Sequence, residues 1–219
     1  MKKIIIIILL IFAVTGLSAS DTTFTKKPDF LKIGKYEKIL NRFINGDRKI
    51  NFLDLRMSFT KTSKYNPYEK TLDTISKSMI DLLNEKKYKE AIKLADTILL
   101  KEYVDMYAHY ACYYAFSALQ DTNNATFHEY IMDRLLNSIV ESGDGKTPAS
   151  AFLVISNREI YFLIFIYGFE QKSVSFSTYK GDPIEIHTVY DPKNKDTYEL
   201  HFNTSLMLQR QEELLRKKK

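Results

Sequence analysis

The spacing of apolar residues changes near residue 142, and this change limits the possible folds more than any other feature of the chain. Before it, apolar side chains such as Tyr36, Ile39 and Phe43 recur every three or four residues, which is typical of amphipathic helices. After it, apolar and polar residues alternate, as at Val174 and Phe176, which is typical of strands. Because the two patterns occupy separate parts of the chain, the sequence predicts an α+β fold.

The helical part, residues 21–142, begins with a loose lead and carries its first helix from about residue 34. Short polar breaks separate the later helices, so we expect antiparallel helical hairpins. Residues 87–92 resemble the middle of a tetratricopeptide repeat, where an aromatic residue is followed three residues later by Ala, here Tyr88 and Ala91. The resemblance implies closely packed, tetratricopeptide-like helix pairs and covers about one and a half units.

The second part, residues 143–219, predicts a small antiparallel sheet packed on the helices and a closing C-terminal helix. Strands are expected at 151–156, 172–179, 184–190 and 198–202, and the helix at 205–216. Residues 159–169 are almost wholly apolar, and periodicity does not separate a buried strand from a buried helix there. Glu159 near the start of that run favours a helix.

The junction between the two parts carries the most recognisable stretch. Residues 142–148 read Ser-Gly-Asp-Gly-Lys-Thr-Pro, and the apolar run 151–156 and the segment 159–163 follow. This order resembles a family of uncharacterised exported bacterial proteins, mainly of Bacteroidetes type, catalogued as a domain of unknown function. The resemblance covers about residues 35–215. It implies a tetratricopeptide-like helical part, a β-rich tail introduced by G-D-G-K-[ST]-P and a helix at 159–169, and it brings no catalytic residues.

The Gly-Lys-Thr letters at 145–147 do not form a phosphate-binding loop. Such a loop needs another Gly at position 140, where Val140 stands, and a helix after the turn instead of before it. We therefore interpret Gly143 as a helix C-cap residue and Asp144 with Gly145 as a turn.

Residues 1–20 have the order of a secretory signal. A short basic start is followed by eleven apolar residues at 4–14 and by small residues that permit cleavage after Ala19 or Ser20. Eleven helical residues rise about 16 Å, half of a ~30 Å hydrocarbon core, so a transmembrane span is the weaker alternative. We expect a periplasmic or secreted protein without a stable membrane span after cleavage.

Charge and cysteine content exclude several classes of protein. Loss of Lys2 and Lys3 with the signal lowers the formal net charge from +5 to +3, so we expect no nucleic-acid partner. The single Cys112 excludes an internal disulfide framework and Cys-rich metal sites, and its apolar surroundings predict a buried thiol. The basic end at 216–219 is interpreted as a solvated helix terminus, with weak membrane-surface contact as the alternative.

Four tyrosines are the candidate binding residues. Tyr103, Tyr107, Tyr110 and Tyr114 follow one another at steps of four, three and four residues, which places them in one stripe of a helix. The functional interpretation is an aromatic groove for a peptide or a glycan. The alternative is core packing with the hydroxyl groups at the rim.

His187 and His201 are a weak candidate pair for a metal. If the last hairpin pairs Thr188 with Leu200, the two imidazoles stand opposite each other on one face, beside Glu185. They would then ligate a transition metal or repel each other when protonated. Cross-strand His pairs are more often solvated surface, so we assign no metal and no cofactor.

Catalytic patterns are absent from the sequence. It has no G-x-S-x-G elbow, no H-E-x-x-H and no Gly-rich dinucleotide turn. It therefore favours a non-enzymatic, exported binding or scaffold protein that recognises a peptide or protein segment. The alternative is an envelope hydrolase or glycan-active enzyme with a site at the helix–sheet junction. The sequence leaves the partner and the oligomeric state open.

Overall fold

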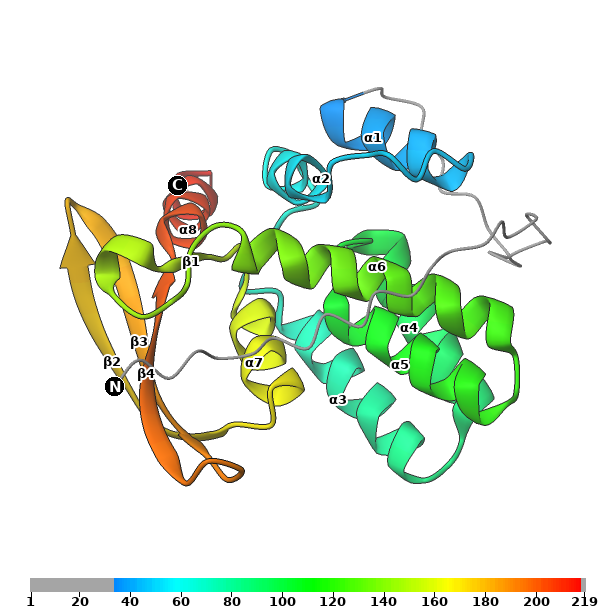
Figure 1. The fold of residues 1–219 in the computed structure, drawn as a ribbon. Helices are drawn as coiled ribbons and strands as arrows, with labels where there is room; N and C mark the ends of the chain where they lie inside the picture. Colours follow the sequence, from blue (N-terminus) through cyan, green and yellow to red (C-terminus); the bar gives the residue numbers. More distant parts are fainter. Residues whose placement is uncertain (1–33, 218–219) are drawn as a thin grey trace.

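The computed structural model describes residues 34–217, which form a helical part and a sheet with α7 between them (Figure 1). The predicted signal at 1–20 and the whole of the lead at 21–33 lie outside the described residues, as does the end of the chain at 218–219. This architecture confirms the α+β class. In chain order the elements are α1 (Lys35–Ile44), α2 (Phe52–Phe59), α3 (Lys70–Asn84), α4 (Tyr88–Lys101), α5 (Met106–Ala118), α6 (Thr122–Val140), the short 3₁₀ turn η1 (Pro148–Ser150), β1 (Phe152–Leu153), α7 (Asn157–Ile166), β2 (Glu170–Tyr179), β3 (Asp182–Asp191), β4 (Asp196–Asn203) and α8 (Ser205–Arg216).

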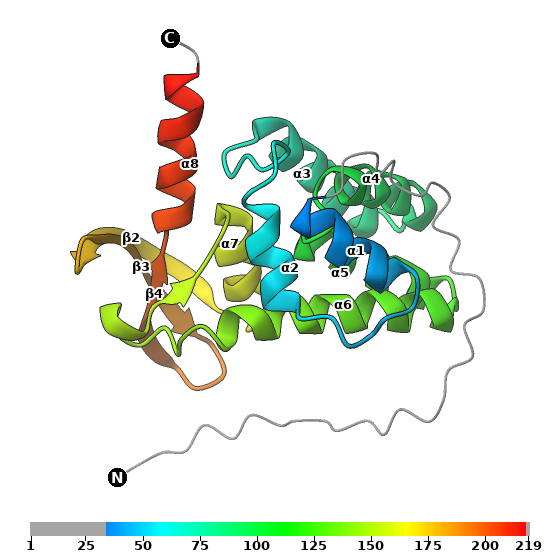
Figure 2. The same ribbon diagram turned by 90° about the horizontal axis from the view of Figure 1, so that it is seen from above.

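Helix α5 lies at the centre of the helical part. It contacts α3, α4, α6 and α7, and α2 packs against α6 beside it (Figure 2). Ala108, Ala111 and Ala115 on α5 are fully buried, and these small side chains let neighbouring backbones approach closely. The connection between α3 and α4 is only residues 85–87, so the chain reverses sharply there.

The sheet is mixed, whereas the sequence predicted a wholly antiparallel one. Its strand order is β1-β4-β3-β2; β2–β3 and β3–β4 are antiparallel, but β1 pairs with β4 in parallel. The strand expected at 151–156 is shortened to Phe152–Leu153, because Ser156 already serves as the N-cap of α7. Lys180 and Gly181 join β2 to β3 with positive φ angles of 52° and 91°, a tight turn that matches the strand twist.

The pairing of β3 with β4 differs by one residue from the predicted register. The structure pairs His187 with Leu200 and Ile186 with His201. Successive side chains in a strand point to opposite faces, so a one-residue change separates the two imidazoles onto opposite faces of the sheet. The predicted His187–His201 pair is therefore wrong.

The error has a physical cause in the burial of both sheet faces. Ile184 and Val189 lie on opposite faces of β3, yet both are fully buried. Alternation of apolar and polar residues identifies the core side only when one face is solvated. In β3 both faces are buried, so this alternation does not show which set of residues faces the helices.

The apolar run at 159–169 is helical as far as Ile166, where α7 ends, so the expected helix is confirmed for most of the run. The hydroxyl of Ser156 accepts a hydrogen bond from the Glu159 amide at 3.3 Å and caps the first turn of α7. Ile160 and Leu163 of this helix are buried in a single core that also includes Tyr36 at one end of the described chain and Met207 near the other. The two predicted parts therefore share one core.

The Gly-Asp-Gly stretch is a structural turn. Gly145 has a φ of +66°, and a Cβ there would stand 2.2 Å from the Phe152 ring. Its carbonyl accepts a hydrogen bond from the His201 amide at 2.8 Å, which ties the turn to β4. Helix α6 ends before Gly143, with Glu141 as its C-cap, so the predicted cap role of Gly143 is wrong; a Cβ at Gly143 would instead meet the Ser150 carbonyl at 2.3 Å.

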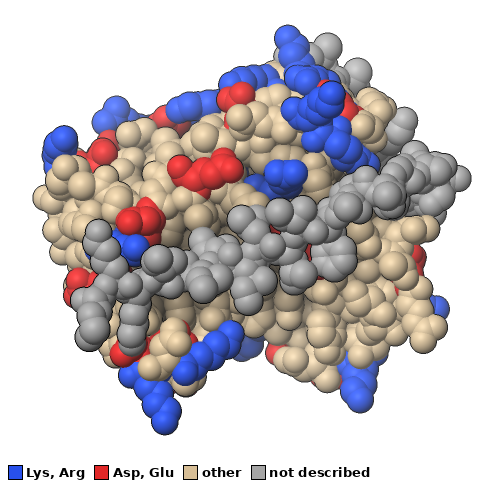
Figure 3. Space-filling model, viewed as in Figure 1, with Lys and Arg blue, Asp and Glu red and all other residues tan. Residues whose placement is uncertain are grey.

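Surface charge is mixed on the face drawn in Figure 3, where acidic side chains stand between the Lys and Arg side chains. Within residues 34–217, no helix is both long enough and apolar enough to cross a membrane.

Candidate functional site: an aromatic groove

A groove of about 700 Å³ opens between α3, α5 and α7. This volume lies within the usual range for ligand pockets. Aromatic rings from α5 and α7 form one side of the groove, and α3 forms the other with polar side chains and with Ile80 and Leu83. The aromatic side consists of Tyr107, Tyr110, Tyr114, Tyr161 and Phe165, and the polar side includes Asp73, Ser76, Lys77, Asp81 and Asn84.

The predicted tyrosine stripe is only partly placed in this groove. Tyr107, Tyr110 and Tyr114 line it, and Tyr114 is 46% exposed. Tyr103 does not line it, because α5 begins only at Met106 and Tyr103 belongs to the connection before it. Its side chain is 2% exposed and packs against Phe43 in the core. Tyr103 therefore does not share a helix face with the other three tyrosines, because it lies before the helix begins.

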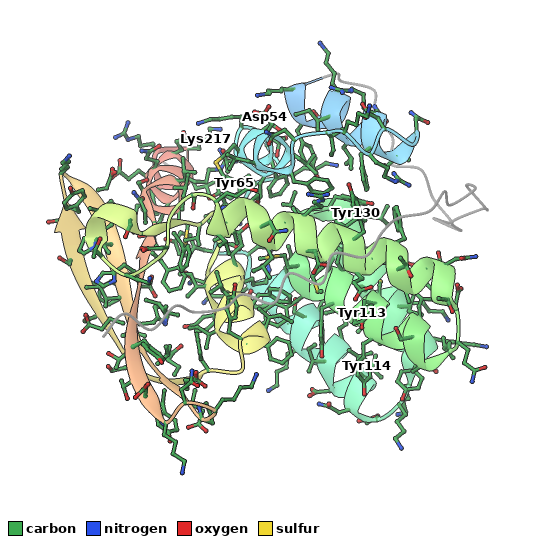
Figure 4. All side chains as sticks on the ribbon, viewed as in Figure 1. Asp54, Tyr65, Tyr113, Tyr114, Tyr130 and Lys217 are labelled. Carbon is green, nitrogen blue, oxygen red and sulfur yellow. The ribbon has the colours of Figure 1, made fainter. Side chains whose placement is uncertain are left out.

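Helix α7 contributes two rings that the sequence analysis did not select. Tyr161 and Phe165 are each 45% exposed and lie one helical turn apart on the groove side. The Phe165 ring lies 5.1 Å from that of Tyr110 in an edge-to-face contact. Figure 4 shows Tyr114 and its neighbour Tyr113 on α5. The sequence could have indicated these two residues, because a helix over 159–169 places positions 161 and 165 on a common face.

The polar side of the groove carries alternating charge. Asp73, Lys77 and Asp81 are exposed and follow one another at steps of four residues, so they form one row along α3. Within the described chain, Lys77 and Asp81 make no ion pair shorter than 4.0 Å, which leaves both side chains free to meet a ligand.

The chain is a member of a known sequence family. The model of a domain of unknown function, DUF4919, matches residues 32–213. The chain belongs to this family. No curated protein and no solved structure matches it. Membership in the DUF4919 family confirms the predicted resemblance to a domain of unknown function, and it supplies no site residues.

A charged cluster, buried except for Asp73, borders the groove, which Asp73 and Arg158 line. Arg158 of α7 donates hydrogen bonds to Asp105 at 2.7 Å, to Asp73 at 3.2 Å and to Glu102. Burial raises the pKa of Glu102, although Arg158 opposes the effect. Asp105 also caps α5 by accepting from the Ala108 amide at 2.8 Å. These carboxylates hold Arg158 and the helix end in place.

This cluster is also where a catalytic site at the helix–sheet junction would be sought. The space that Glu102, Asp105 and Glu159 enclose is too small to admit a water molecule. Two catalytic carboxylates must reach a substrate and a proton. Glu102, Asp105 and Glu159 have no such access in the structure.

The weak metal candidates do not form a site. His187 lies against Glu185 of its own strand, with 2.8 Å between Nε2 and the carboxylate, and its ring contacts Tyr161. His201 lies on the other face, with Nδ1 3.1 Å from the Gly145 carbonyl. Among residues 34–217, no group of three or more His, Cys, Asp or Glu side chains is placed to hold a metal ion.

A second pair of histidines is buried in the helical part. The Nδ1 atoms of His109 on α5 and His128 on α6 are 3.0 Å apart, and His109 Nε2 lies 2.8 Å from the Tyr103 carbonyl. Nε2–H of His109 must donate to that carbonyl, so its Nδ1 accepts from Nδ1–H of His128. Burial lowers the pKa of His109 to about 4 and that of His128 well below its usual range. Both rings are therefore neutral near pH 7.

Proposed function

We propose that this protein is an exported binding or scaffold protein that recognises a peptide or protein segment in the groove between α3, α5 and α7. The partly exposed rings of Tyr114, Tyr161 and Phe165 are the single observation that carries this proposal. Large aromatic side chains provide contact area at low cost in side-chain entropy and are enriched where proteins bind other proteins.

The two unlike sides of the groove support a segment as the ligand. Apolar side chains of a bound segment would pack on the rings, while its backbone and charged groups would meet the row of Asp73, Lys77 and Asp81. We also propose that α3 to α6 pack as tetratricopeptide-like hairpins. The contacts between consecutive helices and between α3 and α5 support this packing, and helical repeats commonly bind extended partners along such surfaces.

The binding proposal is tested with selected peptides. We expect random peptides displayed on phage to yield binders, and the affinity of one synthetic binder to fall about tenfold or more in Tyr161→Ala and Phe165→Ala, measured by titration calorimetry. Because both rings are almost half exposed, these variants should keep the fold. Phe176→Ala is the matched control, since Phe176 is an exposed ring on β2 outside the groove.

Equal loss in the control and the groove variants would refute the groove as the site. Mass spectrometry of the recovered peptide separates binding from catalysis. An intact peptide agrees with a binding protein, whereas a peptide cut at one position would favour the hydrolase alternative.

We further propose that the protein is exported, to the periplasm or beyond, in a bacterium of Bacteroidetes type. The basic, apolar and small-residue order of 1–20 supports this, as does the resemblance carried by residues 142–148. When the chain is expressed with its own N-terminus, we expect N-terminal sequencing of the envelope fraction to begin at Ser20 or Asp21. Replacing Ile8 by Arg should leave the uncleaved chain in the cytoplasm. A native chain that keeps Met1 would contradict export.

A further inference from the structure

Strand β2 is an edge strand whose outer side has no partner within residues 34–217. It is the last strand in the order β1-β4-β3-β2 and runs for ten residues. Eight of these ten residues are exposed, and Phe176 is the most exposed large apolar side chain of the described chain, at 78%. An unpaired edge of this length presents a row of free backbone N–H and C=O groups to other strands.

Native proteins usually carry features that block strand pairing along such an edge. In β2 these features lie only at the two ends of the strand. A β-bulge at Gln171–Ser173 includes Lys172, and Lys180 follows the strand at the turn. Bulges and lysines are common means of blocking edge-to-edge pairing. The segment between them, Ser173–Thr178, contains no charge and no Pro. The middle of the edge is therefore open to pairing.

We propose that a second copy of this chain pairs with this edge, so that two β2 strands run antiparallel about a two-fold axis at Ser175. In this register Ser175 faces Ser175 of the other copy, and Val174 faces Phe176 in two equivalent pairs. Directly opposed apolar side chains of this kind stabilise neighbouring antiparallel strands. The segment is thus complementary to itself.

Charge selects this register over its neighbours. With the axis at Ser175, the Glu170 end of one strand lies beside Lys180 of the other at both ends of the pairing. Moving the axis to Phe176 would place Lys172 opposite Lys180 twice, and like charges directly opposed are destabilising. Moving it to Val174 would place Phe176 opposite Lys172. Of these three registers, only the one with its axis at Ser175 places opposite charges beside each other and apolar side chains opposite each other.

The expected dimer is weak and reversible. Stable interfaces bury about 800 Å² on each partner, and one pair of strands supplies less. Sedimentation velocity of the purified chain between about 1 µM and about 1 mM should show a concentration-dependent shift from monomer to dimer. Phe176→Lys should raise the dissociation constant about tenfold, because it replaces two apolar pairs by charges.

Disulfide trapping tests the register itself. Ser175→Cys should form covalent dimers under mild oxidation, because opposed Cα atoms in antiparallel strands lie about 4.5–5.5 Å apart. Ser177→Cys is the matched control, since two such residues would stand about 13 Å apart along the strands. An equimolar mixture of Ser173→Cys and Ser177→Cys chains should form mixed dimers. The native Cys112 is buried and does not compete.

A wild-type chain that stays monomeric over the whole concentration range overturns the proposal and leaves the edge to a strand of another protein. The proposed dimer is also overturned if Ser175→Cys chains form covalent dimers no faster than Ser177→Cys chains do. Neither result bears on the groove, because peptide affinity is measured separately and Phe176 is its control.

Discussion

Replacing Arg56 by Ala should lower the free energy of unfolding by about 3–5 kcal/mol, the largest effect that we expect from one substitution. Arg56 on α2 is fully buried. Its guanidinium donates hydrogen bonds to Ser138 of α6 at 2.9 Å and to the Leu153 carbonyl of β1, and it forms an ion pair with Glu159 of α7 at 2.8 Å. Removing it leaves Glu159 as a buried charge without its cation.

Urea unfolding followed by circular dichroism measures this effect. Lys35→Ala is the matched control, because the Lys35–Asp54 pair also involves α2 but both side chains are more than half exposed. We expect that control to lose less than about 1 kcal/mol. A loss below about 1 kcal/mol in Arg56→Ala would show that the pair does not hold α2 to α7.

A double variant separates the loss of the cation from the loss of packing. Arg56→Met with Glu159→Gln removes both charges, and the introduced amide keeps an acceptor for the Ile155 backbone N–H, which now donates to Glu159 at 2.8 Å. Because no buried charge is left unpaired, the double variant should be more stable than the sum of the two single losses predicts, by about 0.5–3 kcal/mol.

The second large effect is an acid sensitivity that originates in His109 and His128. Both rings are buried and neutral in the folded state, whereas in the unfolded chain they bind protons below a pKa of about 6.5. The unfolded state therefore binds more protons as the pH falls. The contribution to stability is complete above pH 6.5 and is lost progressively below it, by about 3 kcal/mol at pH 4 for His109 alone.

Other buried groups act in the opposite direction, so a difference measurement is needed. Burial raises the pKa of Glu102 and of Glu159, and such carboxylates favour folding at low pH. We therefore compare wild type with His109→Gln/His128→Gln at each pH. The stability of the wild type relative to the double variant should fall by about 3 kcal/mol or more between pH 7 and pH 4.

Nitrogen-15 NMR of the wild-type histidines gives an independent readout that does not require the variant to fold. Both buried imidazoles should stay neutral down to about pH 5. The Nε2 of His109 and the Nδ1 of His128 should carry the protons. Titration of either ring near pH 6.5 would contradict the buried, hydrogen-bonded pair.

Local patterns predicted most of the helices correctly. The run that begins at Glu159 is helical as far as Ile166, and the Ser156 hydroxyl caps its first turn by accepting from the Glu159 amide. The closing helix was expected at 205–216, and α8 spans Ser205–Arg216. Such signals depend on residues within one or two turns of each other, so they can be identified in a single sequence.

The groove was predicted only in part, because local patterns identify the residues of one helix but not the second helix that packs against it. The positions of Tyr107, Tyr110 and Tyr114 on one helix follow from their spacing alone. Their pairing with Tyr161 and Phe165 depends on how α7 packs against α5, tens of residues away along the chain. Tyr103 failed the prediction because the start of α5 at Met106, and not the spacing, decides which tyrosines share a face.

The sequence by itself determined the α+β class, most of the helices and the hairpin strands, because amphipathic spacing and capping are local properties. Only the tertiary structure decided the strand register, the parallel pairing of β1, the exposure of each tyrosine and the partners of Arg56. Arg56 and Ser138 are 82 residues apart in the chain. Contacts of that kind arise from the packing of whole elements, in which burial on both faces of the sheet overrides the simple alternation of apolar and polar residues.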